Sequence, residues 1–495
     1  MSEYSKYRLL EILPGTFVWA TFLLTLIFSF IKPIWVIVFM IVFVFYWLVR
    51  LFYMQIFLFL GFYRYRKASQ IDWKEKIKNL PGVDHLYHAV FFPTYKEPYE
   101  VLHTSLAALR RSQYPCMNER FIVILAGEEG DRKNFLDIVQ RLQKDFEKSF
   151  FAFLVTVHPK GISGELPGKG SNTAHAGREL KKFIDAKHIP YANVLVSNFD
   201  ADTQVHEQYF SYLTFVYFHH PRRQRASYQP LPLFNNNVWE APSFARVVSY
   251  STTFWMMTEQ IRPERLFTFS SHAMPFQALV DVGFWQSDIV TEDSRICLQC
   301  LQHYDGDYEV VPLYIPVSMD VVVGDTLWET IKSQYVQQRR WAYGVENFPY
   351  MVWNFFPNKK IAFVKKFRYM WNQLEGVYSW ATAQLLMLIF GRLPLWLLDE
   401  SERQTTVALN APHILQILMT VSTVGIIVSA FIGTMLLPPR PSHVPKRRML
   451  YMLFQWPLII VSLIVFGSIP STDAQTRLMF GKYLGFDVTK KVRRS

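Results

Sequence analysis

The stretch Val194-Leu195-Val196-Ser197-Asn198-Phe199-Asp200-Ala201-Asp202 decides the fold, because an apolar run leads directly into two aspartates one residue apart. A short apolar run is typical of a strand that is buried on both faces of a parallel sheet. Asp200 and Asp202 then lie at the carboxyl end of that strand, where open α/β sheets bind their ligands. Alone, an Asp-x-Asp is usually a turn or a helix cap. In this place it predicts a site for Mg²⁺ or Mn²⁺, with substrate phosphate oxygens as further ligands.

Short apolar runs alternate with amphipathic stretches on both sides of this segment, over residues 63–355. The predicted strands are Ala89–Phe92, Phe121–Leu125, Phe151–Val157 and Val194–Phe199, and the predicted helices are Tyr99–Arg111, Asp131–Phe146 and Ser171–Ala186. This alternation predicts an α/β fold with a mostly parallel open sheet. Because ligands bind at the carboxyl ends of such strands, the segment Pro93–Pro98 is expected near the two aspartates.

A second acidic motif, Thr291-Glu292-Asp293, lies further along the chain. It reads equally as an ordinary helix start, with Thr291 as the N-cap and acids in the first turn. The dipole of that helix would keep Asp293 ionised, which a general base for a sugar hydroxyl requires.

The stretch Thr326–Tyr343 predicts a helix, with Asp325 as the candidate N-cap and Gly344 just past the end. Gln337, Arg340 and Trp341 share one face of it. Arg340 can neutralise a diphosphate and Trp341 can stack on a pyranose ring. Helices that carry aromatic and basic residues are otherwise common as interfacial membrane anchors.

Five apolar segments are each near the length of about 20 residues that a helix needs to cross hydrocarbon. They are Thr16–Ile31, Ile34 to about Phe62, about Val377 to Leu398, Ile414–Leu437 and Met449–Ile469. The sequence therefore predicts two transmembrane helices (1–62), a cytoplasmic domain (63–355), a basic amphipathic interfacial helix (356–376), C-terminal transmembrane helices (377–469) and a basic tail (470–495).

The charges beside these segments predict the orientation. Lys6 and Arg8 precede the first span and basic residues lie between the last two, whereas the loop Asp399–Glu402 is acidic. By the positive-inside rule the protein is a multi-pass protein of the inner cell membrane whose middle domain faces the cytoplasm. Three spans after that domain would place the basic segment Lys490–Arg494 outside, so one span is miscounted or re-entrant, with Pro457 and Pro394 as suspects.

The 495 residues carry a formal charge of +12 and three cysteines, Cys116, Cys297 and Cys300. No zinc finger or basic heptad pattern occurs, so the charge indicates membrane lipids and a nucleotide diphosphate as partners, and no nucleic acid. The Cys297-x-x-Cys300 spacing fits one helix face and lacks the second pair that a zinc site needs.

Taken together, the three motifs and the flanking spans resemble the membrane-integrated family 2 glycosyltransferases, the group that holds cellulose, chitin and hyaluronan synthases. The resemblance covers about residues 89–344 and implies a GT-A type domain inserted between transmembrane helices. It also implies a nucleotide sugar donor and assigns the catalytic motif to Asp293 and Glu292. The donor pocket would be formed by Thr94, Tyr95, Glu97, Lys169, Asn172 and Asp200, and the diphosphate and acceptor face by Gln337, Arg340 and Trp341.

The chain departs from the family pattern after the second strand. The usual paired aspartates are replaced by Glu128 and Glu129, so Glu128 is the expected contact of the nucleotide base and the nucleotide stays open. About 25 residues follow the last predicted span, which disfavours a cellulose synthase with a cyclic-dinucleotide module. His272 lies before the acceptor region and is expected either to contact a sugar or to be structural.

The sequence thus predicts a metal-dependent, inverting hexosyltransferase that uses a nucleotide diphosphate sugar. A polysaccharide acceptor, with translocation as a further step, is favoured by the Gln-x-x-Arg-Trp motif. Transfer of a single sugar to a membrane lipid is the alternative. A non-catalytic membrane transporter that senses nucleotide sugars is a different class, and it would have no need for Asp293.

Overall fold

The computed structural model describes residues 2–485, so the predicted basic segment Lys490–Arg494 lies outside the described residues. These residues form one eight-stranded sheet in the order β3-β2-β1-β4-β7-β6-β8-β5. Its strands are β1 (Tyr87–Pro93), β2 (Phe121–Glu128), β3 (Ala152–His158), β4 (Val194–Asn198), β5 (Gln204–Val205), β6 (Ala226–Leu233), β7 (Ala273–Pro275) and β8 (Glu309–Ser318). The four predicted strands are β1 to β4, and they are parallel to one another. β7 is antiparallel to both of its neighbours, so the sheet is mixed.

The central strand β1 is buried on both faces. Ala89 and Phe91 pack into the core on one face of the sheet, and Val90 and Phe92 pack into the core on the other. Because successive side chains point to opposite faces, a strand covered by helices on both sides needs an unbroken apolar run. This burial explains why the first four strands could be predicted from the sequence.

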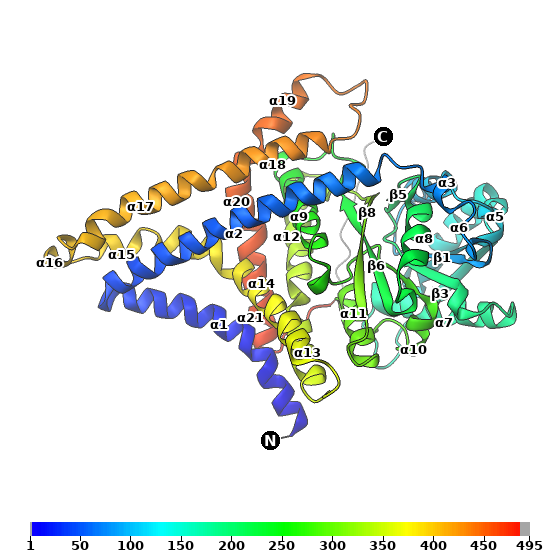
Figure 1. The fold of residues 1–495 in the computed structure, drawn as a ribbon, viewed down its shortest axis with the longest axis horizontal. Coiled ribbons are helices and arrows are strands. Elements are labelled where there is room, and N and C mark those ends of the chain that lie inside the picture. Colours follow the sequence, from blue (N-terminus) through cyan, green and yellow to red (C-terminus); the bar gives the residue numbers. More distant parts are fainter. Residues whose placement is uncertain (1, 486–495) are drawn as a thin grey trace.

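Helices cover both faces of the sheet and form the rest of the domain (Figure 1). They are α3 (Trp73–Ile77), α4 (Tyr99–Arg110), α5 (Met117–Arg120), α6 (Arg132–Phe146), α7 (Lys169–Ala186), α8 (Tyr209–His219), α9 (Ser243–Gln260), α10 (Phe276–Asp281), α11 (Glu292–His303), α12 (Leu327–Ala342) and α13 (Asn347–Phe355). α12 begins one residue later than predicted, because Thr326 rather than Asp325 is the N-cap and forms a capping box with Glu329.

The remaining helices lie at the two ends of the described chain. They are α1 (Glu3–Ile31), α2 (Pro33–Ala68), α14 (Phe363–Phe390), α15 (Leu393–Trp396), α16 (Glu400–Arg403), α17 (Thr406–Ser422), α18 (Val424–Met435), α19 (Arg447–Phe454), α20 (Ile459–Leu463) and α21 (Ile469–Met479). Within residues 2–485, four helical stretches are long and apolar enough to cross a membrane: α1, α2, α17 with α18, and the stretch Arg447–Met479.

α14 joins two segments that the sequence analysis separated. It runs without a break from Phe363 to Phe390, so the predicted interfacial helix and most of the predicted span from about Val377 belong to one helix. No proline interrupts these residues, and the helix ends at Gly391, three residues before Pro394. The predicted boundary at residue 376 therefore lies inside a helix.

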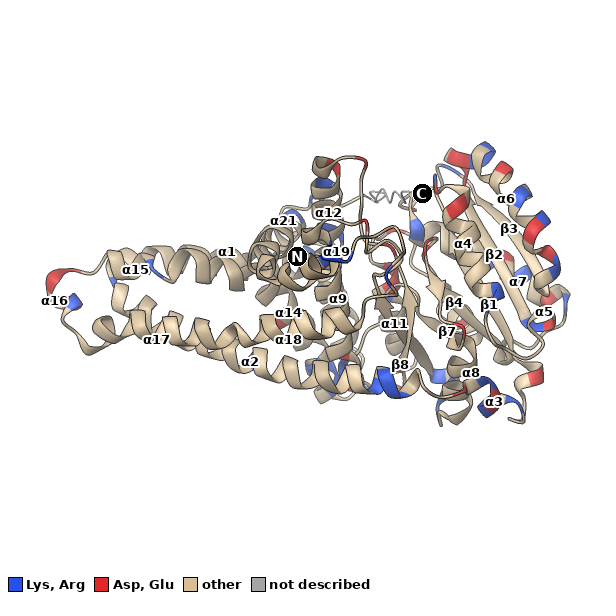
Figure 2. Ribbon diagram, turned by 90° about the horizontal axis from the view of Figure 1, so that it is seen from above, with Lys and Arg blue, Asp and Glu red and all other residues tan. Residues whose placement is uncertain are grey.

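The helices differ in direction. α1, α2, α14 and α17 extend away from the sheet towards the short helix α16, whereas α20 and α21 run across them beside the domain that holds the sheet (Figures 1 and 2). The extended bundle is almost free of charged residues between its tip and the domain (Figure 2). The predicted span Met449–Ile469 thus lies across the bundle, and its Pro457 falls in a 3₁₀ turn. The helices that extend towards the tip pack as two pairs, α1 with α14 and α2 with α17. α21 instead ends beside the domain that holds the sheet.

The crossing helix α21 lies along α12 and also packs against the start of α1. Arg339 of α12 forms an ion pair with Asp473 of α21 at 3.2 Å, and Tyr335 donates a hydrogen bond to the same carboxylate. Arg8 of α1 donates hydrogen bonds to the carbonyl oxygens of Leu478 and Met479. Polar contacts of α21 therefore connect α1 with α12 of the domain that holds the sheet.

Candidate active site

A cavity of about 1990 Å³ begins at the carboxyl ends of β1, β2 and β4 and continues between the long helices. The predicted site residues that line it are Thr94, Tyr95, Glu97, Glu128, Lys169, Asn172, Asp200, Asp202, Glu292, Asp293, Gln337, Arg340 and Trp341. Segments that lie far apart in the sequence thus meet around one space. His272 is the predicted site residue that does not line it.

Lys169, the first residue of α7, joins the two acidic motifs. Its Nζ lies 2.6 Å from Asp200 Oδ1 and 2.8 Å from Asp293 Oδ2. Burial alone would favour the neutral amine, but the two carboxylates outweigh it and hold the pKa of Lys169 well above its usual range. The close approach of α7 to the start of α11 and the loop before it depends on Gly170, since a Cβ there would lie 2.9 Å from the carbonyl oxygen of Gln286 and 3.2 Å from Glu292 Cβ. Lys169 is therefore a fixed positive charge between the two acidic motifs.

Asp293 is held on three sides. Lys169 contacts its Oδ2, and Asn198, two residues before Asp200, donates a hydrogen bond of 3.1 Å to its Oδ1. The ring of His272 lies 3.8 Å from the same Oδ1 but is fully buried behind it, where Nδ1 lies 2.9 Å from the carbonyl oxygen of Phe269. Burial lowers the pKa of His272, so the ring is neutral. Of the two roles expected for His272, its position supports the structural one.

Glu292 lies beside Asp293 but in a different environment. Its side chain is buried, and burial together with the neighbouring Asp293 raises its pKa to about 8. A raised pKa disfavours the ionised form, which a general base needs. Of the two acids, the arrangement supports Asp293 as the base.

Asp200 and Asp202 follow β4 and face the cavity. Asp202 is almost fully buried and its Oδ2 accepts a hydrogen bond of 2.8 Å from the backbone N–H of Asp320. Nowhere in residues 2–485 does a group of three or more His, Cys, Asp or Glu side chains suit a metal ion. Mg²⁺ is commonly held by one or two carboxylates and completes its coordination with substrate phosphates and water. The two aspartates fit a cation of that kind, which would bind together with a diphosphate.

The edge of the cavity at β2 and β3 holds two residues that the sequence analysis missed, His158 and Glu165, beside the predicted Glu128. Glu128 and His158 are paired across the parallel strands, with His158 Nδ1 3.0 Å from Glu128 Oε2, and His158 Nε2 lies 2.8 Å from Glu165 Oε2. The hydrogen bond with Glu128 is the main cause that raises the pKa of His158, and Glu165 adds to it. His158 directly follows a predicted strand, and this position was a signal that could have revealed it.

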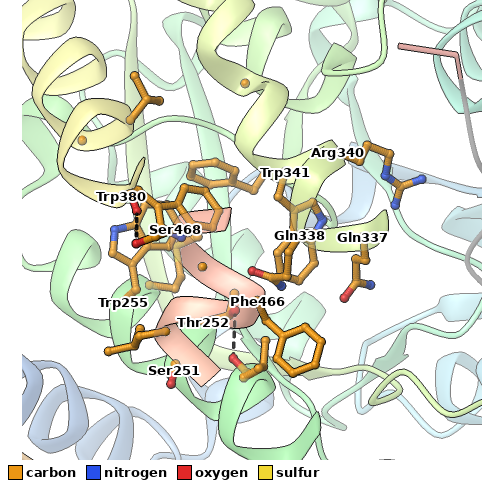
Figure 3. A pocket seen from close by; sticks show the side chains of 18 of the residues that line it. Ser251, Thr252, Trp255, Gln337, Gln338, Arg340, Trp341, Trp380, Phe466 and Ser468 are labelled. Atoms are coloured by element: carbon orange, nitrogen blue, oxygen red, sulfur yellow. Dashed lines mark hydrogen bonds between the residues drawn. The ribbon is translucent and has the colours of Figure 1, made fainter. Parts of the chain in front are cut away.

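Gln337, Arg340 and Trp341 reach the cavity from α12, as their shared helix face predicts. Trp341 points towards Trp255 of α9, Trp380 of α14 and Phe466, whereas Arg340 lies on the opposite side of the view (Figure 3). The hydroxyl of Ser468 fixes α14 beside the crossing helix by donating a hydrogen bond of 2.9 Å to the carbonyl oxygen of Trp380. Trp255 and Trp380 were not predicted, because tryptophans in apolar helices carry no signal of a site.

The family model "Glycosyl transferase family group 2" matches residues 195–463. No curated protein matches the chain in sequence. Among solved structures, the mannosyltransferase PcManGT from Pyrobaculum calidifontis, in complex with GDP-Man and Mn²⁺, is 12% identical with a TM-score of 0.40, and the alignment covers 84% of this chain and 96% of that one. TarS of S. aureus (residues 1–349, with UDP) is 14% identical with a TM-score of 0.35, over 81% of this chain and 94% of that one.

The matched segment begins in β4, just before Asp200, and ends in α20. It includes the acidic motifs, α12 and the helices that extend from the domain. The resemblance to the synthases of cellulose, chitin and hyaluronan stays a prediction, because the family model is broader than that group. Since the model covers more than half of the 495 residues, the chain belongs to family group 2 of the glycosyl transferases and is a glycosyltransferase with a GT-A-like fold.

Proposed function

We propose that the protein transfers a hexose from a nucleotide diphosphate sugar to an acceptor hydroxyl, with inversion at the anomeric carbon. The observation that carries this proposal is the meeting of Asp293, Lys169 and Asp200 in one cavity that also contains the Gln337, Arg340 and Trp341 face. A base, a cation for the leaving group and a place for a sugar ring are then within one space. A transporter that only senses nucleotide sugars would have no use for the base.

The residues divide into a donor end and an acceptor end. Thr94, Tyr95, Glu97 and Glu128 line the end at β1 and β2, where we place the nucleotide. When bound, Mg²⁺ or Mn²⁺ at Asp200 and Asp202 would neutralise negative charge on the diphosphate. Lys169, Asn172 and Arg340 would hold the diphosphate beside it.

In the transfer step, Asp293 accepts the proton of the acceptor hydroxyl while the acceptor oxygen forms a bond with the anomeric carbon. The bond from that carbon to the diphosphate oxygen breaks, and its electron pair leaves with the nucleotide diphosphate. Attack from the side opposite the leaving group inverts the anomeric centre. The cationic side chains Lys169 and Arg340 stabilise the charge that develops on the leaving group.

Two acceptors fit this step. A polysaccharide end is supported by Trp341, since Trp255 and Trp380 extend the aromatic surface on which a sugar chain could stack (Figure 3). A membrane lipid is supported by the continuation of the cavity between the long helices. For either acceptor we propose that the catalytic domain faces the cytoplasm, where nucleotide sugars are made.

The test is to offer the purified full chain in a lipid bilayer a panel of nucleotide sugars with Mn²⁺ and to measure free nucleoside diphosphate. One donor should give release that depends on Asp293, so the Asp293→Asn variant serves as the matched control. Tight binding of a nucleotide sugar without release of nucleoside diphosphate under any condition would favour the sensor class and overturn the proposal.

A further inference from the structure

The cavity does not end at Trp341. It continues along α2, α14, α17 and α18, where the lining side chains are mainly apolar. They include Val44, Leu51, Met387, Leu388, Leu415 and Met419. These helices form the part of the molecule that is almost free of charge (Figure 2). A single space thus connects Asp293 with the region that the bilayer would surround.

This part of the cavity is open to one side. α17 packs against α2, and α14 packs mainly against α1. Leu388 of α14 and Met419 of α17 both line the cavity, yet they are 63% and 57% exposed. Apolar side chains that are both cavity-lining and exposed form the rim of an opening, and here the rim would lie against lipid chains.

We propose that the acceptor is a membrane lipid with a neutral hydroxyl headgroup, which enters sideways between α14 and α17 and presents its hydroxyl to Asp293. This inference rests on the proposed function and names its acceptor. The acyl chains would lie against the apolar helices, while the headgroup would lie at the level of Trp255, Trp341 and Trp380 (Figure 3). Tryptophan is enriched at the level of lipid headgroups, because its ring is apolar and its N–H is polar.

Apolar side chains outnumber polar ones along this part of the cavity, which favours acyl chains over a sugar chain. A buried sugar needs a hydrogen-bond partner for nearly every hydroxyl, whereas an acyl chain needs only apolar contact. On the helices that extend from the domain, the cavity-lining charges within residues 2–485 are Arg50, Glu375 and Arg392, and the first two form an ion pair with each other. Uncharged polar side chains that could bind a headgroup also line the cavity. They include Ser251, Thr252 and Gln338 (Figure 3), and Gln384 and Gln416 on the extended helices.

The chemistry of the site indicates a hydroxyl rather than a lipid phosphate. A phosphate oxygen is already ionised at neutral pH and needs no base, whereas an alcohol must lose a proton as it attacks. Asp293 accepts that proton, the alcohol oxygen bonds to the anomeric carbon, and the nucleoside diphosphate leaves. A phosphate headgroup would also meet the negative charge of Asp200 and Asp293.

The first experiment uses the full chain in phosphatidylcholine bilayers and the radiolabelled nucleotide sugar that supports release. Separate samples contain dioleoylglycerol, stearoyl ceramide, undecaprenyl phosphate or no added lipid. We expect a chloroform-soluble labelled product with dioleoylglycerol or the ceramide, in proportion to the lipid added. Label found only in a polymer, only on undecaprenyl phosphate, or in no lipid product would overturn the inference.

The second experiment narrows the opening. Leu388→Trp should raise the concentration of acceptor lipid needed for half-maximal rate by about tenfold, which corresponds to about 1.4 kcal/mol. The neighbour Ile389 is 47% exposed but does not line the cavity, so Ile389→Trp is the matched control and should leave this concentration unchanged. On α17, Met419→Trp and Ile417→Trp form a second pair of the same kind.

The outcomes separate the two proposals. Slow release of nucleoside diphosphate to water in the absence of acceptor should be the same in Leu388→Trp and in the wild type. Release without any lipid product would overturn the lipid acceptor and leave the transferase standing. Equal effects of Leu388→Trp and Ile389→Trp on lipid use would show that the opening is not the entrance.

Discussion

Lys169 Nζ lies 2.8 Å from Asp293 Oδ2, so the proposed base forms an ion pair with the residue that is expected to contact the donor diphosphate. The same amine contacts Asp200 at 2.6 Å. A donor diphosphate offers Lys169 a stronger anionic partner, and binding of the donor would thereby release Asp293 to accept a proton. The arrangement predicts that the order of binding is donor first and acceptor second.

Lys169→Ala should impair donor binding and the rate together. Removing one partner of a buried charge pair weakens the binding free energy by about 2–5 kcal/mol, because the carboxylates that remain are no longer neutralised. The donor affinity should be measured by titration calorimetry and the rate by release of nucleoside diphosphate. Lys182→Ala, on the same helix but exposed and paired with Glu179, is the control and should behave as wild type.

Asp293→Asn should bind donor and metal but lose a factor of about 10²–10⁴ in rate, the usual contribution of a general base. Asn can still accept the hydrogen bond from Asn198 and so preserves the local structure. Single-turnover rates across neutral pH provide the measurement. Asp281→Asn, a carboxylate bonded to Gln277 and Tyr304 outside the cavity, is the control. Near-normal turnover of Asp293→Asn would mean that another residue is the base.

Asp202→Asn should abolish transfer and weaken the metal-dependent part of donor binding. The fold should survive, because the amide oxygen can still accept the hydrogen bond from the backbone N–H of Asp320. Donor binding should be compared with Mn²⁺ and with excess chelator for both proteins. If the wild type turned over normally in chelator, the metal role of Asp200 and Asp202 would be refuted.

His158→Gln should remove a pH dependence of stability. The pKa of His158 is raised by Glu128 and Glu165, while the unfolded value is about 6.5. A raised pKa in the folded state gives stabilisation that is complete below about pH 6.5 and is lost as the pH rises through the folded value. The melting temperatures of wild type and variant should therefore differ most below about pH 6.5. The exposed His219→Gln is the control, and a difference that grew towards high pH would contradict the assigned ion pairs.

The orientation predicts that the tip of the bundle is outside the cell. After replacement of the exposed Cys116, a cysteine at the exposed Ser401 should react with an impermeant thiol reagent in intact cells, and one at the exposed Ser163 should not. The reverse pattern would place the catalytic domain outside, away from cytoplasmic nucleotide sugars.

The sequence predicted the parts of the fold in which local pattern and tertiary burial agree. β1, β2 and β4 are buried on both faces and the edge strand β3 is half-buried, so their apolar runs were sufficient. β6 and β8 were missed because β6 contains Pro230 and Pro232 and β8 contains Pro312 and Pro316, which weaken any strand pattern. The sequence also could not predict that α20 and α21 run across the other long helices, because hydropathy gives the length of an apolar helix and not its direction in space.

The sequence predicted those site residues whose motif places them just after a strand or on a defined part of a helix. Asp200, Asp202, Asp293 and the α12 face came together as expected. For His272 the sequence left two roles open, because a histidine beside a buried tryptophan cannot be told from a ligand-binding one by sequence. Its ring is in contact with the N–H of Trp285 and lies behind the base.

The contact between α12 and α21 changes what can be called a domain in this protein. Cutting the chain after residue 355 would leave α12 without Asp473, the ion-pair partner of Arg339 and the acceptor for Tyr335. The helix that carries Gln337, Arg340 and Trp341 would then lose the surface that holds it. Transfer activity should therefore need the whole chain, and a soluble fragment cut at the apparent boundary should retain the nucleotide end of the cavity while losing the acceptor end.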